Sequence, residues 1–296
     1  MKLAVFTKNR SNPAYGAARL GADRAAAQWG AEVRHYVPDT PDDPVEQSAL
    51  IERALAESPD AFVLSPVHAS RVNPAIEQVV RAGIPMVGFV NPITVGHMVS
   101  YIGADDVRLA REMAQYLFRH LGGRGRVLVV GGPVDSVTSR DRLRGFSEAA
   151  AEAPGIDIVG SVPGDYDRVI ARTRVADWLR GHPAVDACLA ANDIMAVGLL
   201  EALDARGAQA AVVGVNAIPE AIQAIGAGRM LATADFNAMQ MAYLATECAV
   251  RHLRGLPVPR ALELPVQVVD RANYPDWDRP YEQRPVRPLA HFWRQT

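Results

Sequence analysis

The sequence has few cysteines, no long apolar run and no excess of charge of either sign. Cys188 and Cys248 each fall in an apolar segment, so we expect two buried free thiols that act as small hydrophobic side chains. No segment reaches the roughly 18 consecutive apolar residues of a membrane span. With 31 Lys and Arg against 33 Asp and Glu, the formal net charge is −2. We therefore expect neither nucleic-acid binding nor attraction to an anionic membrane.

Motifs that carry catalysis or bind cofactors are also absent. The seven histidines form no HExxH or similar ligand pair, so a zinc site is not predicted. The sequence contains no GxSxG nucleophile elbow and no GxxxxGK[ST] phosphate loop. We predict no catalytic residue, no metal and no cofactor, and hence a protein that is not an enzyme. An α/β enzyme is the weaker alternative, which turnover assays would test.

Length and composition favour a two-domain globular protein. The chain has 296 residues, of which 49% are hydrophobic and 22% charged, and domains average roughly 100–200 residues. The start, MKLAVFT, is typical of a first strand and not of a signal peptide. The predicted location is the periplasm if a signal was removed, and the cytoplasm if this start is native.

Short apolar runs alternate with amphipathic stretches along most of the chain. Such runs are typical of parallel strands covered by helices on both faces, and the segments 14–30 and 106–121 have helical periodicity. Two doubly wound lobes fit better than one sheet of ten strands. The predicted strands are 2–7, 31–37, 61–66, 85–90, 98–103, 126–132, 156–162, 186–192, 210–216 and 230–236.

Polar residues recur where these predicted strands end. Ligands of open α/β sheets bind at the carboxyl ends of strands, and amides both donate and accept hydrogen bonds, as sugar hydroxyls do. Asn and Asp also cap helices, which is the interpretation we favour for Asp105, Asp106 and Asp193. The candidate ligand-binding residues from this pattern are Lys8, Asn12, Asn91, Arg140, Tyr166, Asn192 and Asn216.

The chain resembles the ribose-type periplasmic sugar-binding proteins, the type I solute-binding family shared with LacI-type effector domains. The resemblance covers about residues 1–270. Its most specific motifs are NPAYG (12–16), SYIGADD (100–106), GGPVDSVTSRDRLRGF (131–146), LAANDIMAVGLLEAL (189–203) and VVGVNAIPEAIQAIGAGRMLAT (212–233).

The resemblance implies two Rossmann-like lobes joined by a three-strand hinge. Lobe 1 would be 1–103 plus 236–264, and lobe 2 would be 104–235 plus 265–296, with hinge crossings near 103–104, 234–236 and 264–267. A small sugar-like ligand would bind between the closing lobes, and an inner-membrane ABC permease would recognise the closed monomer. The family's ligand positions fall on Asn12, Tyr15, Arg140, Tyr166, Asn192 and, near the second hinge, Phe236.

Three departures from the family pattern bear on the ligand. Val90-Asn91 stands where the family often has an Asp-Arg pair, and Asn216 stands where it often has an aspartate. Ala14 replaces one stacking aromatic. Loss of acceptor carboxylates with retention of Arg140 favours a ligand that carries acceptors. We therefore expect a polyol, a modified sugar or a sugar-derived carbonyl or carboxylate compound rather than an ordinary pentose.

Two alternatives remain open at this stage. The chain could be the ligand-sensing domain of a LacI-type regulator or of a sensor system rather than a transport receptor. The tail 271–296 is rich in proline and aromatic residues, and prolines at this density preclude a regular helix or central strand. We expect it to be extended and pinned onto a lobe by Tyr274, Trp277, Phe292 and Trp293, the alternative being a docking surface.

Overall fold

The computed structural model describes residues 1–182 and 184–294, which form two α/β units with one six-stranded sheet each. Unit 1 consists of Met1–Ala104, Asn237–Pro265 and a segment that starts at Tyr281. Unit 2 consists of Asp105–Phe236 and Val266–Pro280. The expectation that the whole tail belongs to lobe 2 differs from this division, because the segment from Tyr281 onward hydrogen-bonds to helices of unit 1.

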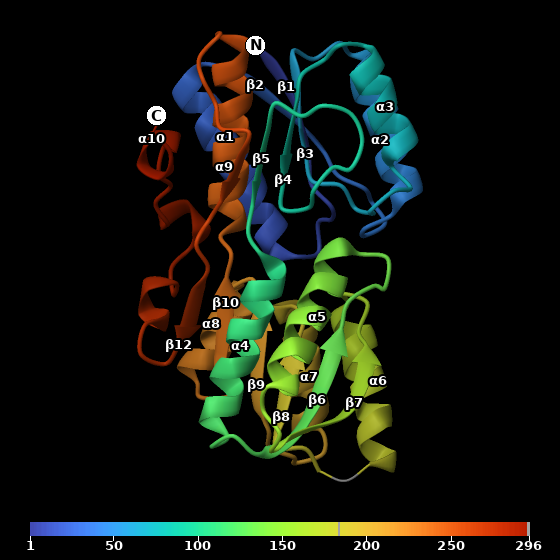
Figure 1. Cartoon of the computed structure of the whole chain (residues 1–296), viewed down its shortest axis with the longest axis vertical. Coiled ribbons are helices and arrows are strands. Elements are labelled where there is room, and N and C mark those ends of the chain that lie inside the picture. Colours follow the sequence, from blue (N-terminus) through green and yellow to red (C-terminus); the bar gives the residue numbers. More distant parts are fainter. Residues whose placement is uncertain (183, 295–296) are drawn as a thin grey trace. The chain divides into compact units, whose positions relative to one another are not determined.

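The sheet of unit 1 is parallel throughout, in the order β11-β5-β4-β3-β1-β2. Helices α1 and α9 pack together, as do α2 and α3 (Figure 1). The strands are β1 (Lys2–Phe6), β2 (Glu32–Tyr36), β3 (Ala61–Leu64), β4 (Met86–Phe89), β5 (Ser100–Gly103) and β11 (Ala261–Glu263). The helices are α1 (Pro13–Trp29), α2 (Pro44–Ala56), α3 (Asn73–Arg81), α9 (Ala238–Leu253) and α10 (Leu289–Phe292), with the 3-10 turn η2 (Tyr281–Gln283).

The sheet of unit 2 has the order β12-β10-β9-β8-β6-β7, and only β12 is antiparallel to its neighbour. Helix α4 packs on α5, and α6 packs on α7 (Figure 1). The strands are β6 (Gly125–Gly131), β7 (Ile156–Pro163), β8 (Ala187–Ala190), β9 (Ala211–Val215), β10 (Ala232–Asp235) and β12 (Gln267–Asp270). The helices are α4 (Asp106–His120), α5 (Val137–Ala151), α6 (Arg168–Gly181), α7 (Asp193–Asp204) and α8 (Pro219–Gly226), with the 3-10 turn η1 (Tyr274–Asp276).

The two units repeat one plan. All ten strands predicted from apolar runs are present, and the predicted helices 14–30 and 106–121 are α1 and α4. In each unit the first strand has the second on one side and the third on the other, so the topological switch point lies between β1 and β3 and between β6 and β8. The carboxyl ends of these strands are where such folds bind ligands.

Close helix packing depends on glycine at two matching places. A Cβ on Gly21 of α1 would overlap the carbonyl of Met239 in α9. A Cβ on Gly145 of α5 would overlap the carbonyl of Val107 in α4. In unit 1 the core beside the sheet is reinforced by Phe6, whose ring stacks on Tyr36 at 4.9 Å and on Phe62 at 5.3 Å between centroids.

The tail is anchored by two of the four predicted aromatics and by one leucine that was not predicted. Tyr274 and Trp277 do pack on unit 2, against a cluster of Ala217, Ile222 and Val269. In the last segment, however, Leu289 is the buried anchor, at 1% exposure, while Phe292 and Trp293 are only half-buried. The sequence alone favoured the larger aromatics because they bury more area.

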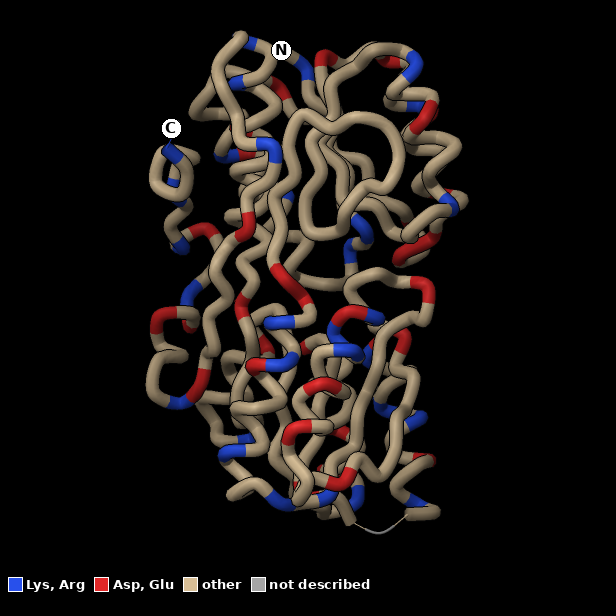
Figure 2. Tube along the Cα trace, in the orientation of Figure 1, with Lys and Arg blue, Asp and Glu red and all other residues tan. Residues whose placement is uncertain are grey.

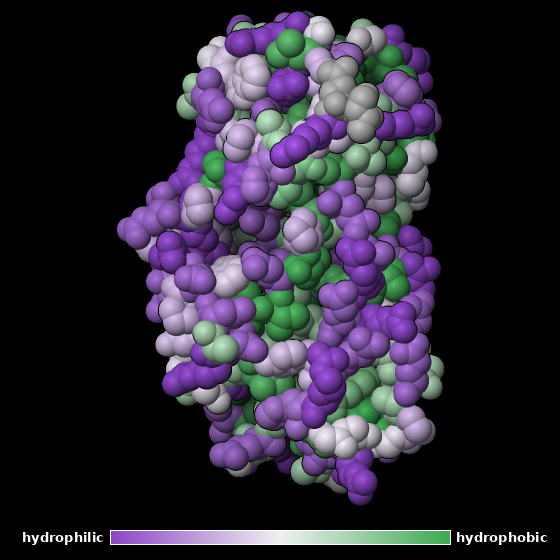
Figure 3. Space-filling view, turned by 60° about the vertical axis from the view of Figure 1, so that its left-hand side comes forward, coloured by the Kyte–Doolittle hydropathy of each residue, from purple (hydrophilic) through white to green (hydrophobic). Residues whose placement is uncertain are grey.

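Charged residues of both signs are interspersed along both units (Figure 2). On the face shown in Figure 3, hydrophobic side chains form small groups separated by hydrophilic ones. Among residues 1–182 and 184–294, no helix has the length and apolar character needed to cross a bilayer.

Candidate functional site

In unit 1, the loop after β1 is held by an internal charge network. The ammonium of Lys8 pairs with a carboxylate oxygen of Asp42 at 3.2 Å, and the side-chain amide of Asn9 donates to the same carboxylate at 2.8 Å. Lys8 is 2% exposed. Its charge is therefore balanced inside the protein. Lys8 helps to hold this loop and is not a free cation.

Asn12 caps the start of α1, and one of its polar groups has no partner among the described residues. Its Oδ1 accepts from the backbone N–H of Ala14 at 3.0 Å, which caps the helix. No described residue accepts from its Nδ2. Tyr15 follows in the first turn and is 8% exposed. The cap thus fixes Asn12 so that its amide group can only donate.

Asn91 follows β4 through a strained turn. Val90 has a φ of 62°, which is costly for a β-branched residue, and the hydroxyl of Tyr101 donates to its carbonyl at 2.7 Å. Asn91 itself is 1% exposed, yet no described residue donates to its Oδ1. A buried acceptor without a partner costs about 1–3 kcal/mol, so this oxygen fits a donor from a bound molecule.

In unit 2, two arginines near the start of α5 behave differently. Arg140 is exposed, and no described residue pairs with its side chain. Arg142 is 4% exposed. Its guanidinium donates to a carboxylate oxygen of Asp106 at 2.7 Å and to the carbonyl of Ala191 at 2.8 Å. It also lies 5.5 Å from the ring centre of Phe236. Arg140 is the free cation, whereas Arg142 supports the buried ring of Phe236.

Tyr166 lies beside the start of α5 although it follows β7. Its hydroxyl is 3.3 Å from that of Thr138, and Gly132 leaves room for its ring, because a Cβ there would overlap it. Asp165 and Tyr166 have φ values of 53° and 57°. The loop after β7 and the start of α5, which carries Thr138 and Arg140, therefore meet at the carboxyl edge of the sheet.

Asn192 and Asn216 follow the neighbouring strands β8 and β9. Oδ1 of Asn192 caps α7 by accepting from the N–H of Met195 at 2.9 Å, and no described residue accepts from its Nδ2. Asn216 has a φ of 124° and is 8% exposed, and its Oδ1 has no donor among the described residues. Like unit 1, unit 2 thus offers an amide that only donates and an amide with an orphaned acceptor.

The capping predictions for the three aspartates hold at one position only. Asp105 caps α4, accepting from the N–H of Arg108 at 2.9 Å. The predictions for Asp106 and Asp193 are wrong. Asp106 pairs with Arg142, and Asp193 is fully buried and accepts from the loop after β9, because Asn192 already caps α7.

Backbone strain is concentrated at these strand ends. Of eight non-glycine residues with positive φ in the described chain, seven follow the carboxyl end of a strand, and only Ser58 precedes a strand. Such conformations cost about 1–3 kcal/mol each and gather at functional sites. The seven residues are Asp42, Val90, Asp165, Tyr166, Asn216, Ala217 and Asn237.

Carboxylates near the strand ends are already engaged. Each of the five carboxylates named below accepts at least one hydrogen bond or pairs with a cation inside its own unit, which leaves it fewer acceptor sites for a ligand hydroxyl. They are Asp42 (Lys8 and Asn9), Asp165 (Arg174), Asp167 (N–H of Ile170), Asp193 (Thr233 and N–H of Ile218) and Asp235 (Trp277).

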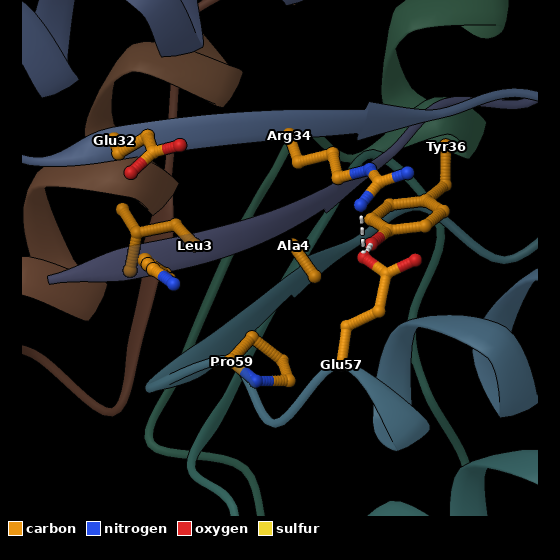
Figure 4. Close-up of a pocket in the computed structure, with 8 residues that line it drawn as sticks. Leu3, Ala4, Glu32, Arg34, Tyr36, Glu57 and Pro59 are labelled. Carbon is orange, nitrogen blue, oxygen red and sulfur yellow. Dashed lines mark hydrogen bonds and ion pairs between the residues drawn. The ribbon is translucent and has the colours of Figure 1, made fainter.

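A pocket of about 150 Å³ in unit 1 lies elsewhere (Figure 4). It is lined by the first residues of β1, by side chains along the whole of β2 and by the loop before β3. Three of its polar side chains interact: a carboxylate oxygen of Glu57 accepts from Arg34 at 2.5 Å and from the hydroxyl of Tyr36 at 2.5 Å. Burial and the bond to Glu57 raise the pKa of Tyr36 to about 12.

Metal and thiol chemistry have no support in the described residues. Within that part of the chain, no three His, Cys, Asp or Glu side chains gather as metal ligands would. Cys188 and Cys248 are free and buried, as predicted, and burial raises the pKa of each thiol to about 12. Neither thiol ionises at neutral pH.

Comparison with known proteins identifies relatives over most of the chain. A family model described as "Periplasmic binding protein domain" matches residues 3–257. The ribose import binding protein RbsB of Bacillus subtilis is 27% identical over 266 residues, which cover 90% of this chain and 85% of that protein.

Two solved structures share the fold. A periplasmic solute-binding protein of an ABC transporter from Actinobacillus succinogenes, with bound D-allose, has a TM-score of 0.88 and 25% identity and covers 93% of this chain and 99% of its own. A solute-binding protein of an ABC transporter from Mycobacterium smegmatis, with bound glycerol, has a TM-score of 0.86 and 27% identity and covers 93% of this chain and 96% of its own.

Proposed function

We propose, from the premise that this chain belongs to the periplasmic binding protein domain family, that it is the solute-binding component of an ABC transporter for a small sugar-like molecule. The observation that carries the proposal is the set of polar side chains at the strand ends. In each unit, one amide can only donate and another has an orphaned acceptor. A polyhydroxylated molecule supplies both partners, since each hydroxyl donates and accepts.

Relatives support this class of ligand. The B. subtilis relative is described as a ribose import binding protein, and the two solved structures hold D-allose and glycerol. All three are small and rich in hydroxyl groups. We infer that the ligand of this chain shares that chemistry and engages strand-end residues of both units, so that binding favours a closed arrangement of the two.

Within this class, the ligand we favour carries a carbonyl or carboxylate group. The strand-end carboxylates are engaged inside the protein, whereas Arg140 has no partner among the described residues. A hydrogen bond from a guanidinium to an anionic acceptor contributes roughly 1.5–3 kcal/mol. A sugar acid or a modified sugar would satisfy Arg140 better than an aldopentose.

We infer that this site binds its ligand without changing it. The relatives are described as binding proteins, and the strand-end groups are amides, a cation and carboxylates fixed in ion pairs or helix caps. The partner we propose is an inner-membrane ABC permease, and the location is the periplasm. A monomer is expected, because the large exposed hydrophobic side chains, such as Val45, Val134 and Leu256, come from separate elements.

A thermal-shift panel tests the proposal. We expect sugar acids to raise the melting temperature more than polyols or D-ribose do, because ligand that binds only the native state stabilises it. Stabilisation by aldopentoses alone would reject the acceptor-bearing ligand. If no sugar, polyol or sugar acid stabilises the protein, the binding function itself is wrong.

A matched pair of variants locates the site. Arg140→Ala should weaken binding of the stabilising compound by roughly 10- to 100-fold, the equivalent of one charge-assisted hydrogen bond. Arg144→Ala on the same helix is the control, because Arg144 is exposed and contacts only surface carboxylates, at 3.6 and 4.0 Å. Equal affinities in isothermal titration would show that Arg140 lies outside the site.

A further inference from the structure

The turn between β9 and α8 holds Asn216 in an unusual conformation. Asn216 and Ala217 have φ values of 124° and 52° in succession, and neither is glycine. The backbone N–H of Asn216 donates to the carbonyl of Ala234 at 2.8 Å, while its side-chain Oδ1 has no donor among the described residues. A turn in this conformation persists only where its surroundings hold it.

Asp193 holds this turn directly and through a hydroxyl. Its Oδ2 accepts from the N–H of Ile218 at 3.1 Å, and its Oδ1 accepts from Thr233 Oγ1 at 2.7 Å. Thr233 Oγ1 in turn accepts from the N–H of Ala217 at 3.3 Å. One carboxylate from α7 thus connects the first turn of that helix, the strand β10 and the two residues after Asn216.

The surroundings of the Asp193 carboxylate indicate no other role for it. Asp193 is 0% exposed, and the charged group that acts on it is Arg142 on α5, which is itself paired with Asp106. Neighbouring β9 presents Gly214, where a Cβ would overlap the carboxylate. Beside the turn, Ala217 belongs to a buried cluster with Ile222 and Val269, against which Tyr274 and Trp277 of the tail pack. The 216–218 turn is therefore fixed by Asp193 and Thr233 as well as by the aromatic tail.

We infer that Asp193 is a positioning residue for the candidate site, whose carboxylate holds the 216–218 turn in place and thereby presents the amide of Asn216 to the ligand. The effect on affinity rests on the proposed function, whereas the effect on the turn does not. Asp193 is not the cap of α7, because Asn192 supplies that cap.

Protonation should weaken this arrangement. Burial raises the pKa of Asp193 to about 7. A carboxylate accepts with both oxygens, whereas protonation turns one of them into a donor, so the hydrogen bond from Thr233 or the one from the N–H of Ile218 is weakened. The turn should therefore be held most firmly above neutral pH and less firmly at acid pH.

Hydrogen exchange of the protein without ligand tests the positioning role. We expect Asp193→Asn, which mimics the protonated group, to accelerate exchange of the Ala217 and Ile218 amides by about tenfold. The matched control is Asp43→Asn, which alters a carboxylate that also accepts two backbone N–H groups, but in unit 1. Asp43→Asn should leave the exchange of these two amides unchanged, and the inference is wrong if Asp193→Asn leaves it unchanged as well.

A second variant covers the case in which Asp193→Asn does not fold. Thr233→Val removes only the bridging hydroxyl and should accelerate exchange at Ala217 more than at Ile218. Its control is Thr246→Val on α9, which removes a buried hydroxyl that has no partner among the described residues. Equal exchange in the two threonine variants would overturn the inference.

The effect of Asp193 on ligand affinity is measured with D-allose and D-galactonate as probes. For the probe that binds, the wild-type Kd should rise about tenfold between about pH 8 and about pH 5.5, and Asp193→Asn should show the weaker value at every pH. A flat wild-type profile would overturn the ligand consequence. If neither probe binds, the proposed function is in doubt, and the exchange experiment still decides whether Asp193 holds the turn.

Discussion

Arg140 and Arg142 show how position on one helix separates two chemically identical side chains. Residues two apart on a helix point in different directions, and Arg142 shares its face with Phe146 and Ala149, both buried. The sequence therefore contained a signal for its burial, namely its spacing of four and seven residues from apolar positions. That signal was missed because arginine is seldom buried unless it is paired, and the partner, Asp106, lies on another helix.

At the same scale, Asp193 should make stability depend on pH. Its pKa is raised from 3.8 to about 7 by burial, so between these values the native state binds more protons than the unfolded state. The free energy of unfolding should then fall as pH rises from about 4 to about 7, by on the order of a few kcal/mol, and level off above that range. Ionisation of Asp193 therefore lowers the free energy of unfolding, although the ionised carboxylate holds the 216–218 turn more firmly.

Chemical denaturation across this pH range measures the effect. The Asp193→Asn variant should lack most of the fall, because its amide does not titrate. Glu247 contributes a smaller fall in the same direction, since burial also raises its pKa. Parallel pH profiles for wild type and variant would contradict the assignment.

At the scale of the element, helix starts determine which atoms of the site remain available. Asn12, Asn192 and Asn237 cap α1, α7 and α9 with their Oδ1 atoms. Capping satisfies helix N–H groups and at Asn12 and Asn192 leaves Nδ2 as the free group. The first turn of a helix thus converts a flexible amide into a donor of fixed direction.

Substitutions at Asn12 separate the two roles of a capping amide. Asn12→Asp should keep the cap, and hence the stability, but replace the ligand-facing donor by an acceptor and weaken binding by about tenfold or more. Asn12→Ala should lose both, with about 1 kcal/mol of stability. Melting temperature and titration calorimetry together check this, and unchanged affinity in Asn12→Asp would place Asn12 outside the site.

The tail segment from Tyr281 is tied to α1 and α9 by backbone hydrogen bonds. Arg24 donates to the carbonyl of Arg284 at 2.7 Å, the amide of Gln240 exchanges two hydrogen bonds of 2.7 Å with the backbone of Arg287, and Glu247 accepts from the N–H of Leu289 at 2.8 Å. Because these bonds use backbone groups of the tail, its own side chains do not reveal where it docks.

Leu289 should be the strongest single contribution of this segment to stability. Leu289→Ala should destabilise the protein by about 2–5 kcal/mol, as for other buried leucines. Leu256→Ala, at a position 40% exposed, is the control and should change stability by less than about 0.5 kcal/mol. Similar melting temperatures for the two variants would show that the tail is not held by Leu289.

At the scale of the whole molecule, the chain passes between the two units at four places. The boundaries follow Ala104, Phe236, Pro265 and Pro280. The resemblance to sugar-binding proteins implies three hinge crossings, and the tail adds the fourth. Such a connection allows the units to move as bodies while the strand-end residues within each stay fixed.

Ligand binding should therefore change the arrangement of the units and not their internal structure. Small-angle scattering should show a smaller radius of gyration when the stabilising sugar or sugar acid is added, because a ligand with contacts to both units favours the closed form. Arg140→Ala at the same ligand concentration should show a smaller change. An identical scattering curve with and without saturating ligand would contradict closure.

The sequence by itself determined the α/β class, the ten main strands and the candidate residues at their ends, because strand burial and strand-end polarity are local patterns. Only the tertiary structure decided that Asp193 holds the turn of Asn216, that Arg142 is buried against Asp106, and that Leu289 anchors the tail. Each of these depends on residues far apart in sequence, and their pairing leaves no periodic trace in the chain. Burial and partner, rather than residue type, decide what a charged group does.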